Sequence, residues 1–578
     1  MERGEIAAVK ETKAQRAERL KAAKNPWEAL EEIEAFARHG YSSIPEEWLK
    51  MYFRWWGVYT QGDGAGVLGG RGGEGKSTPY FMLRIRIPNG IIRSSQLGCV
   101  ARLAEKHARG MADLTVRQNI QLHWLTIESL PEILRELRQC GLTTLAACGD
   151  DTRNITGCPL AGIDASEICD ASPLAFQVQQ MLVGPAEFYN LPRKFKICIT
   201  GCPVWCSYPE INDIGLTATK RTVNGRRETG FSLRIGGGLS SEPHFSVRLP
   251  AFVRWEQVLP VVKGVAEIFR DSDCLRESRE RARLKYLFLR HGWTAARFLE
   301  AIEERIGLTL DPPADDRAPS DAYRDHVGIY PQKQPGCFYV GMAVLRGRIS
   351  AEQMACAARL AEEYGSGDLR ITNMQNLVIV NVPKFHADPL AAGLEQAGLP
   401  ISGSPFWRGA VACTGTEFCK LAITETKGFT RWLVEEMESR MPNFNENLRI
   451  DVTGCPNSCG QHWIADIGLE GKRIKVDGRM ADAYYFCLGG AVGKHQSLAR
   501  PVGYRCLASD VPAAIERLLY FYLGEREEGE TFRSFCARGA DDDLRAALSG
   551  EQARSGSRDA LPEAVAAGVD LGHSIRCL

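Results

Sequence analysis

An internal repeat constrains the fold of this chain more than any other feature of its sequence. Residues 90–119, GIIRSSQLGCVARLAEKHARGMADLTVRQN, align without a gap to residues 347–376, GRISAEQMACAARLAEEYGSGDLRITNMQN. Both copies carry the words ARLA and QN at corresponding places. Agreement over this length does not arise by chance, so the chain contains two related units of supersecondary structure.

Each copy has the same predicted order of elements. A strand leads to a turn at Gly90 or Gly347, an amphipathic helix follows, and then come a second strand (IQLHWLTI or LVIVNVP) and another helix. This order is of ferredoxin-like character. The duplication continues further along the chain, because residues 200–206 (TGCPVWC) mirror residues 453–459 (TGCPNSC). The whole chain is therefore predicted to consist of two related halves.

Four cysteines in the second half are spaced to hold a metal cluster. Cys413 and Cys419 are spaced C-x5-C, and Cys455 and Cys459 are spaced C-x3-C. Thiolates are soft ligands suited to iron–sulfur clusters, and four of them close a [4Fe–4S] cube. Two alternatives remain open from the residues alone. One is zinc, although C-x5-C fits the spacing of zinc knuckles poorly, and the other is a coincidence among the 19 cysteines of the chain.

The sequence motifs around these cysteines resemble those of the ferredoxin-dependent nitrite and sulfite reductases. CTGTEFCKLAITETK and TGCPNSCGQHWIADIG carry the resemblance, which covers about residues 25–545. In that family four thiolates hold a [4Fe–4S] cluster, and the last cysteine also touches the iron of siroheme, a tetrapyrrole with eight carboxylates. The resemblance implies that Cys413, Cys419, Cys455 and Cys459 are the cluster ligands and that Cys459 is shared with siroheme.

The resemblance also implies the fold. We expect an α+β protein of two homologous halves, each a ferredoxin-like repeat plus an α/β segment that binds siroheme and cluster, about a pseudo-twofold axis. The expected divisions are an N-terminal helical region with a Gly-rich loop (1–78), a first ferredoxin-like half-domain (79–145), a first siroheme-binding α/β segment (146–310), a second ferredoxin-like half-domain (325–402), a cluster and siroheme segment (403–548) and a flexible tail (549–578).

Siroheme and an oxyanion substrate both require fixed positive charge. Guanidinium forks match carboxylates, whereas a lysine can attract an anion and also release a proton. By periodicity alone, Arg84 and Arg86 read as the solvated face of a strand. The resemblance instead places around the substrate face of the siroheme iron Arg84, Arg153, Lys194 and Lys196. To the macrocycle and its carboxylates it assigns Arg86, Arg117, Gln118, Gln121 and His123.

The resemblance implies a six-electron reduction of nitrite to ammonia or of sulfite to sulfide. The cluster loop followed by Glu425-Thr-Lys427 resembles the nitrite reductase branch. Lys196, however, stands where plant and cyanobacterial nitrite reductases often have Asn and sulfite reductases have Lys, and a second lysine suits a dianion. We favour nitrite. Sulfite reduction with the same cofactors is the first alternative, and a non-catalytic siroheme and iron–sulfur electron-transfer protein is the second.

The electron donor is predicted to be a separate protein. No G-x-G-x-x-G fingerprint precedes a suitable helix, and two homologous halves leave no room for a flavin module. By resemblance the donor is a small acidic ferredoxin that docks on a basic surface. Lys427, Arg431 and Arg440 could contribute to that surface, or they are ordinary solvated helix charges.

Composition adds little that is specific. Lys plus Arg and Asp plus Glu both number 71 among 578 residues, so the charge balance does not indicate nucleic acid or membrane as a partner. No apolar run resembles a signal peptide or a membrane span. We expect a cytoplasmic monomer.

Three further features need a decision. Cys158, Cys202 and Cys206 read as remnants of a second cluster, with Cys158 at the place of Cys419 and nothing for Cys413, and a second metal site is the alternative. Tyr59 and Cys148 match positions that are covalently linked in a sulfite-reducing branch, although an aromatic core residue and a buried thiol are the plainer interpretation. Residues 70–77 satisfy the P-loop expression, but a strand-like segment rather than a helix follows, so we predict no nucleotide site.

Overall fold

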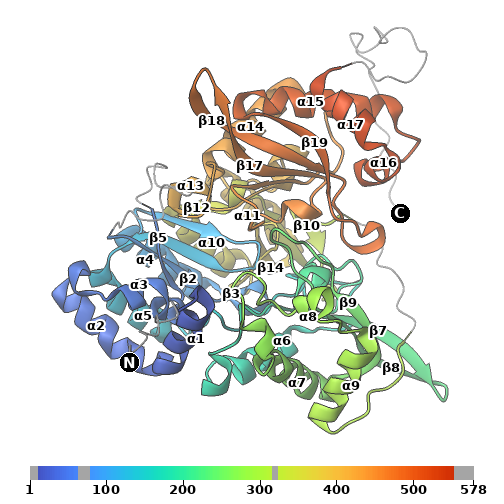
Figure 1. The fold of residues 1–578 in the computed structure, drawn as a ribbon. Coiled ribbons are helices and arrows are strands. Elements are labelled where there is room, and N and C mark those ends of the chain that lie inside the picture. The colour runs from blue at the N-terminus through green and yellow to red at the C-terminus, as the bar shows by residue number, and fades with distance from the viewer. Residues whose placement is uncertain (1–10, 63–78, 315–322, 552–578) are drawn as a thin grey trace, which may run out of the picture.

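The computed structural model describes residues 11–62, 79–314 and 323–551. The P-loop-like residues 70–77 and most of the predicted tail lie outside them. Four sheets organise the described residues, two in the ferredoxin-like repeats and one in each α/β segment. Figure 1 shows the second α/β segment in orange and red at one end of the molecule, the first in green at the other, and the first repeat in blue beside them. The predicted α+β class is confirmed.

Three helices precede the first sheet, and they are α1 (Lys13–Ala23), α2 (Ala29–His39) and α3 (Glu46–Lys50). Thr12 caps α1, since its Oγ1 accepts from the backbone N–H of Gln15 at 3.1 Å and its own N–H donates to Oε1 of Gln15 at 2.9 Å. Lys21 of α1 is fully buried, donates to the carbonyl of Leu191 at 2.9 Å and lies 3.7 Å from Asp150. The N-terminal helix is thereby tied to a loop of the first α/β segment.

The two ferredoxin-like repeats exchange a strand. Their sheets have the orders β1-β2-β5-β4-β12 and β10-β11-β14-β13-β3. The first sheet contains β1 (Val58–Thr60), β2 (Phe81–Ile85), β4 (Met111–Leu114), β5 (Ile120–Leu125) and β12 (Arg348–Ser350). The second contains β10 (Gly328–Pro331), β11 (Cys337–Met342), β13 (Asp368–Ile371), β14 (Leu377–Pro383) and β3 (Ile91–Arg93). Because β12 pairs with β4 and β3 pairs with β13, neither repeat completes its sheet alone.

The predicted order within a repeat is present, with additions. The turns at Gly90 and Gly347 lead into the short exchanged strands, and β4 and β13 follow the first helix of each repeat. The helices are α4 (Ser94–His107) and α5 (Leu130–Gln139) in the first repeat, and α10 (Ala351–Tyr364) and α11 (Ala387–Gln396) in the second. α4 packs against α10, and one hydrophobic core runs through both repeats. The repeats therefore fold as one body.

Two matching glutamines hold the repeats together from inside. Gln118 and Gln375 are both buried and both have positive φ, 55° and 62°. Nε2 of Gln118 donates to the carbonyl of Ile371 in the second repeat at 3.0 Å, and Nε2 of Gln375 donates to the carbonyl of Leu114 in the first at 2.9 Å. The symmetry that the repeat predicts thus extends to individual hydrogen bonds.

The α/β segments share a core arrangement of one parallel pair followed by antiparallel strands. The first contains β6 (Ile197–Thr200), β7 (Ile214–Val223), β8 (Arg226–Ile235), β9 (Val247–Arg254), α6 (Ser172–Leu182), α7 (Val258–Arg270), α8 (Tyr286–Arg290) and α9 (Ala295–Ile306). The second contains β15 (Ala410–Ala412), β16 (Ile450–Thr453), β17 (Ile467–Val476), β18 (Arg479–Leu488), β19 (Arg500–Leu507), α12 (Pro405–Gly409), α13 (Gly415–Phe418), α14 (Lys427–Arg440), α15 (Val511–Glu525), α16 (Phe532–Arg538) and α17 (Asp541–Ser549). In place of β15 the first segment has isolated parallel bridges, Thr152 to Phe195 and Thr156 to Cys198.

Candidate active site

The two cysteine loops begin at the same edge of a sheet. β15 and β16 are parallel neighbours, with Ala412 opposite Val452, so the loops that follow them start side by side. The backbone N–H of Cys413 donates to the carbonyl of Val452 at 3.1 Å, and the N–H of Gly454 donates to Sγ of Cys413 at 3.2 Å. An N–H aimed at a sulfur favours the thiolate form of that cysteine. Cys413 and Cys455 are brought together by this register.

Glycines allow the loops to pack without side chains between them. A Cβ on Gly460, next to Cys459, would lie 2.6 Å from the carbonyl oxygen of Val452. A Cβ on Gly454 would lie 2.8 Å from the carbonyl oxygen of Thr424. Gly415 has φ 65°, and a Cβ there would lie 2.5 Å from Oγ1 of Thr426. Glycine at these positions therefore lets the two loops pack closely, as loops that surround a metal must.

The four cysteines suit a cluster rather than a single ion. Burial raises the pKa of Cys419 and of Cys455 to about 12, so their thiolates require a bound cation. Among the described residues, the sulfurs of these four do not form a group in which all lie within 4.8 Å of one another. Each ligand of a cube binds a different iron, and a cube therefore needs wider spacing than one ion. Cys459 is the exposed member of the four.

Arg84 collects the residues expected on the substrate side. It lies on β2, and its Nη2 donates to Oε1 of Gln121 on β5 at 3.0 Å. Its Nη1 lies 3.2 Å from Sγ of Cys148, and its Cζ lies 5.8 Å from the ring centroid of Tyr59. Tyr59 and Cys148 therefore both border the same guanidinium.

Arg153 approaches the same place from the loop that carries Cys148. Its Nη1 donates to the carbonyl of Ala147 at 3.1 Å and its Nη2 to the carbonyl of Gly149 at 2.8 Å. Burial opposes its charge, yet the nearby Tyr59 and Cys148 raise the pKa of Arg153. Its buried Nε has no hydrogen-bond partner in the described part of the chain. That donor is free for a ligand.

Lys194 and Lys196 precede β6 and share a buried, strongly positive environment. Burial lowers the pKa of Lys194 to about 7, Arg283 lowers it further, and the charge of Cys459 acts in the opposite direction. Burial and the neighbouring Lys194 hold the pKa of Lys196 well below its usual value. The N–H of Lys196 donates to Asp213 at 2.8 Å, which fixes the start of the strand. Lys194 thus interacts electrostatically both with neighbouring cations and with the exposed cluster cysteine Cys459.

Arg86 is a positioning residue for this loop. It is 1% exposed, so the interpretation of Arg86 as a solvated strand residue is wrong. Its guanidinium donates to the carbonyls of Ala146, Thr152 and Arg153 at 3.2, 2.8 and 2.8 Å. It therefore orients the loop from which Cys148 and Arg153 project. A contact of Arg86 with the macrocycle stays a prediction.

The remaining residues assigned to the macrocycle differ in how far they are free. Arg117 donates to Asn212 at 2.8 Å and to the carbonyl of Asn154 at 2.7 Å, and its buried Nε has no partner among the described residues. The amide of Gln118 is occupied by backbone groups, among them the N–H of Gly157 at 3.1 Å. Arg117 can accept a further ligand, whereas Gln118 acts through the backbone that it holds.

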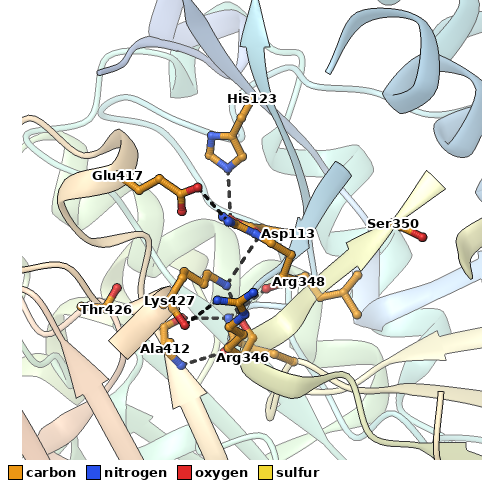
Figure 2. A network of polar contacts seen from close by, with 12 residues as sticks. Asp113, His123, Arg346, Arg348, Ser350, Ala412, Glu417, Thr426 and Lys427 are labelled. Atoms are coloured by element: carbon orange, nitrogen blue, oxygen red, sulfur yellow. Dashed lines mark hydrogen bonds and ion pairs between the residues drawn. The ribbon is translucent and has the colours of Figure 1, made fainter. Parts of the chain in front are cut away.

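His123 belongs to a buried polar network that sequence reasoning missed (Figure 2). Nε2 of His123 lies 3.2 Å from Asp113, and the imidazole stacks on Phe418 of the cluster loop with 4.0 Å between ring centroids. Arg348 bonds Asp113 at 2.9 Å and Glu417 of α13 at 2.8 Å. The network therefore joins the exchanged strand β12, the strand β4 and the first cluster loop. The sequence signal for this network was Asp113, an acidic residue inside the otherwise mostly apolar segment MADLTV.

Lys427 is part of the same network, which corrects one sequence prediction. Its side chain is 2% exposed and lies 3.7 Å from Asp113, so it cannot form part of a docking surface for a donor protein. Burial lowers the pKa of Lys427 to about 8, and Asp113 acts in the opposite direction. Arg431 and Arg440 are exposed and paired with glutamates four residues away, as ordinary helix charges are.

Breaking this network should loosen the cluster loop. Arg348→Met removes two buried ion pairs and leaves Asp113 and Glu417 without it, so we expect the free energy of unfolding to fall by about 3 kcal/mol. The measurement is urea unfolding followed by loss of cluster absorbance. The control is Arg431→Met, which removes an exposed pair and should change stability by under about 0.5 kcal/mol. Equal effects of both substitutions would contradict a structural role for the network.

The structure also corrects the placement of Cys158. Oε1 of Gln118 accepts a hydrogen bond from the backbone N–H of Gly157 at 3.1 Å. Oε1 of the matching Gln375 accepts one from the backbone N–H of Ala412 at 3.0 Å. Gly157 and Ala412 are therefore equivalent, and each immediately precedes a cysteine. Cys158 consequently stands for Cys413, not for Cys419 as the motif spacing suggested. The first half has counterparts of three cluster cysteines and lacks the one for Cys419.

Comparison with known families decides between the interpretations of the cysteines. The family described as "Nitrite and sulphite reductase 4Fe-4S domain" matches residues 148–310 and 403–534. The family described as "Nitrite/Sulfite reductase ferredoxin-like half domain" matches residues 74–140 and 330–397. The chain belongs to the nitrite and sulfite reductase family. Each domain type occurs twice, in agreement with the internal repeat, and the zinc and coincidence alternatives for the four cysteines are set aside.

Named relatives carry either substrate in their names. The assimilatory ferredoxin-dependent nitrite reductase of Haloferax mediterranei is 38% identical over 543 residues, covering 88% of this chain and 89% of the relative. Sulfite reductase (ferredoxin) 2 of Mycolicibacterium paratuberculosis is 36% identical over 540 residues, covering 91% and 95%. The solved structure of the Mycobacterium tuberculosis NirA protein superposes with a TM-score of 0.86 at 35% identity, covering 92% of this chain and 97% of that one.

Family membership confirms an oxidoreductase that uses siroheme and a [4Fe–4S] cluster. The residues present fit these groups, because the thiol of Cys459 is exposed and interacts electrostatically with Lys194, while the buried Nε atoms of Arg117 and Arg153 have no hydrogen-bond partner among the residues that the structure describes. Within the described residues, every helix is too short or too polar to cross a membrane.

Proposed function

We propose that this enzyme reduces nitrite to ammonia with six electrons taken one at a time from reduced ferredoxin. The observation that carries the proposal is a group of half-buried cations, in which Arg84 and Arg153 donate to the same carbonyl of Ala147 and Lys194 interacts electrostatically with Arg153 and Cys459. Positive charge that is partly removed from water has to be matched by anions, and Cys459 is the cysteine expected to join the two cofactors. A small oxyanion bound there would face both cations and donors of protons.

Specific residues would hold the cofactors. Cys413, Cys419, Cys455 and Cys459 would bind the cluster, with Cys459 shared with siroheme, and the free Nε of Arg117 would meet a siroheme carboxylate. When bound, the cluster supplies single electrons, and siroheme supplies the iron at which N–O bonds break.

The chain's own cations would bind, orient and protonate the substrate. Arg84 and Arg153 keep their charge at any working pH and would hold the oxyanion by hydrogen bonds. Lys194, with a pKa of about 7, can release a proton from Nζ at neutral pH and be reprotonated. Each departing oxygen must leave as water, so a nearby donor of this kind lowers the barrier.

Two sequence comparisons favour nitrite over sulfite. The nitrite reductase from Haloferax mediterranei is 38% identical to this chain, and the first cluster loop resembles the nitrite reductase branch. Sulfite reduction remains the second candidate, because Lys196 is present and mycobacterial relatives carry that name.

Lys196→Asn tests the substrate. We expect nitrite turnover to remain largely intact and any sulfite turnover to fall by roughly tenfold, because one charged hydrogen bond to a dianion is worth about 1.5 kcal/mol or more. The measurement is steady-state kcat/KM for each anion with reduced methyl viologen, for the wild type and the variant. A wild-type kcat/KM for sulfite well above that for nitrite, abolished in the variant, would make the enzyme a sulfite reductase.

The same assay separates an enzyme from a non-catalytic carrier. Protein that contains both cofactors in full and reduces neither anion with the chemical donor would be an electron-transfer protein. With catalysis established, replacing methyl viologen by reduced ferredoxin tests the partner. We expect the rate to saturate with ferredoxin concentration and the KM for ferredoxin to rise with salt, since complementary charge steers the encounter of the two proteins.

A further inference from the structure

Three cysteines outside the active site form a compact group. Sγ of Cys206 lies 3.5 Å from Sγ of Cys158 and 3.9 Å from Sγ of Cys202, and all three sulfurs lie within 4.8 Å of one another. All three side chains are buried, and none is in a disulfide. The backbone N–H of Val204 points at Sγ of Cys202 at 3.4 Å. Three buried thiols that meet without a disulfide call for a ligand that binds them together.

The group occupies three of the four cluster positions of the first half, but with a different geometry. Its members are the counterparts of Cys413, Cys455 and Cys459, and the fourth position has no cysteine. Within the described residues, only the first-half group brings three ligand atoms within 4.8 Å. The three sulfurs of the first half therefore lie closer together than the cluster cysteines of the second half do. That spacing suits one ion, whereas a cube needs four wider-spaced ligands.

The observed spacing matches a tetrahedral zinc ion. Zinc binds thiolate sulfur at about 2.3 Å, and two ligands on a tetrahedron at that radius lie about 3.8 Å apart. The measured 3.5 and 3.9 Å fall on either side of that value. The C-x3-C spacing of Cys202 and Cys206 is within the usual range of zinc sites, which the C-x5-C pair of the active site is not.

A buried histidine, His326, is the candidate for the fourth ligand. His326 is 5% exposed, and neither ring nitrogen has a hydrogen-bond partner among the described residues. His326 lies against β11, because a Cβ on Gly341 would meet the carbonyl oxygen of His326 at 1.6 Å, and Tyr339 of the same strand packs with the three cysteines. The ring nitrogens of His326 are not within 4.8 Å of all three sulfurs, and a rotation of the side chain is needed to complete a tetrahedron.

The surroundings favour a site with net negative charge. Three thiolates and one divalent ion carry one negative charge together. Arg324 lies close by, because it lines the same pocket as Cys206, and its Nη1 pairs with Asp164 at 2.5 Å. Apolar residues close the other sides, since the three cysteines share a core cluster with Tyr339 and Val378 of the second repeat. The group therefore lies between the first α/β segment and the second half of the chain.

We propose that Cys158, Cys202 and Cys206, joined by His326, bind one structural zinc ion that clips the second half of the chain to the first α/β segment. The thiols lose their protons on binding, which go to solvent, and no oxidation state changes. A Cys3His set with no open position is a structural rather than a catalytic site. This zinc would hold the segment that begins the second repeat, and it does not depend on which anion the enzyme reduces.

Elemental analysis of the intact holoenzyme tests the proposal. Protein made in zinc-replete medium should contain about one zinc beside about five irons and four acid-labile sulfides per chain. X-ray absorption at the zinc edge should show sulfur at about 2.3 Å and one imidazole nitrogen at about 2.0–2.1 Å. Zinc below about a tenth per chain, a shell of oxygen only, or three to four extra irons with matching sulfide would overturn the proposal.

Variants locate the ion. Cys206→Ser should lose the zinc and keep the iron, and His326→Ala should lose the imidazole signal and release zinc faster to a chelator. The matched control is Cys198→Ser, because Cys198 is a buried thiol of β6 whose Sγ bonds Ser207 at 3.2 Å outside the group. Zinc retained in full by Cys206→Ser would overturn the assignment. If that variant does not fold, the absorption spectrum of the wild type decides alone.

Discussion

Replacement of Lys194 by alanine is expected to lower kcat/KM for both nitrite and sulfite by roughly ten- to a hundredfold, because a charged hydrogen bond to a desolvated anion contributes about 1.5–3 kcal/mol. Lys194 interacts electrostatically with Cys459, and burial lowers the pKa of Lys194 to about 7. Removing it takes away both an attraction for the anion and a source of protons. Steady-state assays with reduced methyl viologen measure the loss.

The pH profile separates these two roles. The protonated form of Lys194 is the active one, so kcat should fall as the pH rises through its pKa, and anionic cofactors will move that limb above the value of about 7. Lys194→Arg keeps the charge but cannot release a proton, so KM should stay near the wild type while kcat falls and the alkaline limb disappears. Lys263→Ala, at an exposed lysine of α7, is the control and should leave the profile unchanged. An alkaline limb that survives in both Lys194 variants would contradict proton donation from this residue.

Replacement of Cys459 by serine is expected to abolish reduction of both anions. Cys459 is the exposed cluster cysteine and interacts electrostatically with Lys194, and one thiolate at this place could serve the cluster and siroheme together. The siroheme absorption bands and the cluster signal should therefore both change. Optical and electron paramagnetic resonance spectra of the purified variant are the measurement.

The internal repeat supplies a matched control for this substitution. Cys206 occupies the position of Cys459 in the first half, in the same C-x3-C spacing. Cys206→Ser should leave the siroheme bands and the cluster signal in place. A Cys459→Ser enzyme that loses the cluster signal alone, with siroheme bands unchanged, would refute the shared ligand.

Much of the fold follows from the sequence because the repeat is long and gap-free. It predicts two ferredoxin-like units and two α/β segments, whereas the paired hydrogen bonds of Gln118 and Gln375 between the repeats are a finding of the structure. The exchange of β3 and β12 between the repeats is not predictable in this way. A three-residue strand has no local signal that specifies its partner strand.

The cysteine loops could be identified from sequence because their residues are neighbours in the chain. The roles of Arg84 and Lys194, which the resemblance implies, stay predictions. The burial of Lys427 depends on Asp113 and Arg348 from distant strands and has no such local signal. Cys158 was misplaced because motif spacing alone was counted. The hydrogen bonds of the preceding residue, Gly157, show the true equivalence. Contacts between elements carry that information, and the order of residues does not.

The most direct test of the account is the electron balance of the reaction with reduced ferredoxin as the sole donor. Nitrite consumed, ammonia formed and ferredoxin oxidised are measured together under anaerobic conditions. The account predicts one ammonia for each nitrite and six ferredoxins oxidised for each ammonia, with no nitric oxide released. Failure to form ammonia from nitrite, together with stoichiometric sulfide from sulfite, would contradict it.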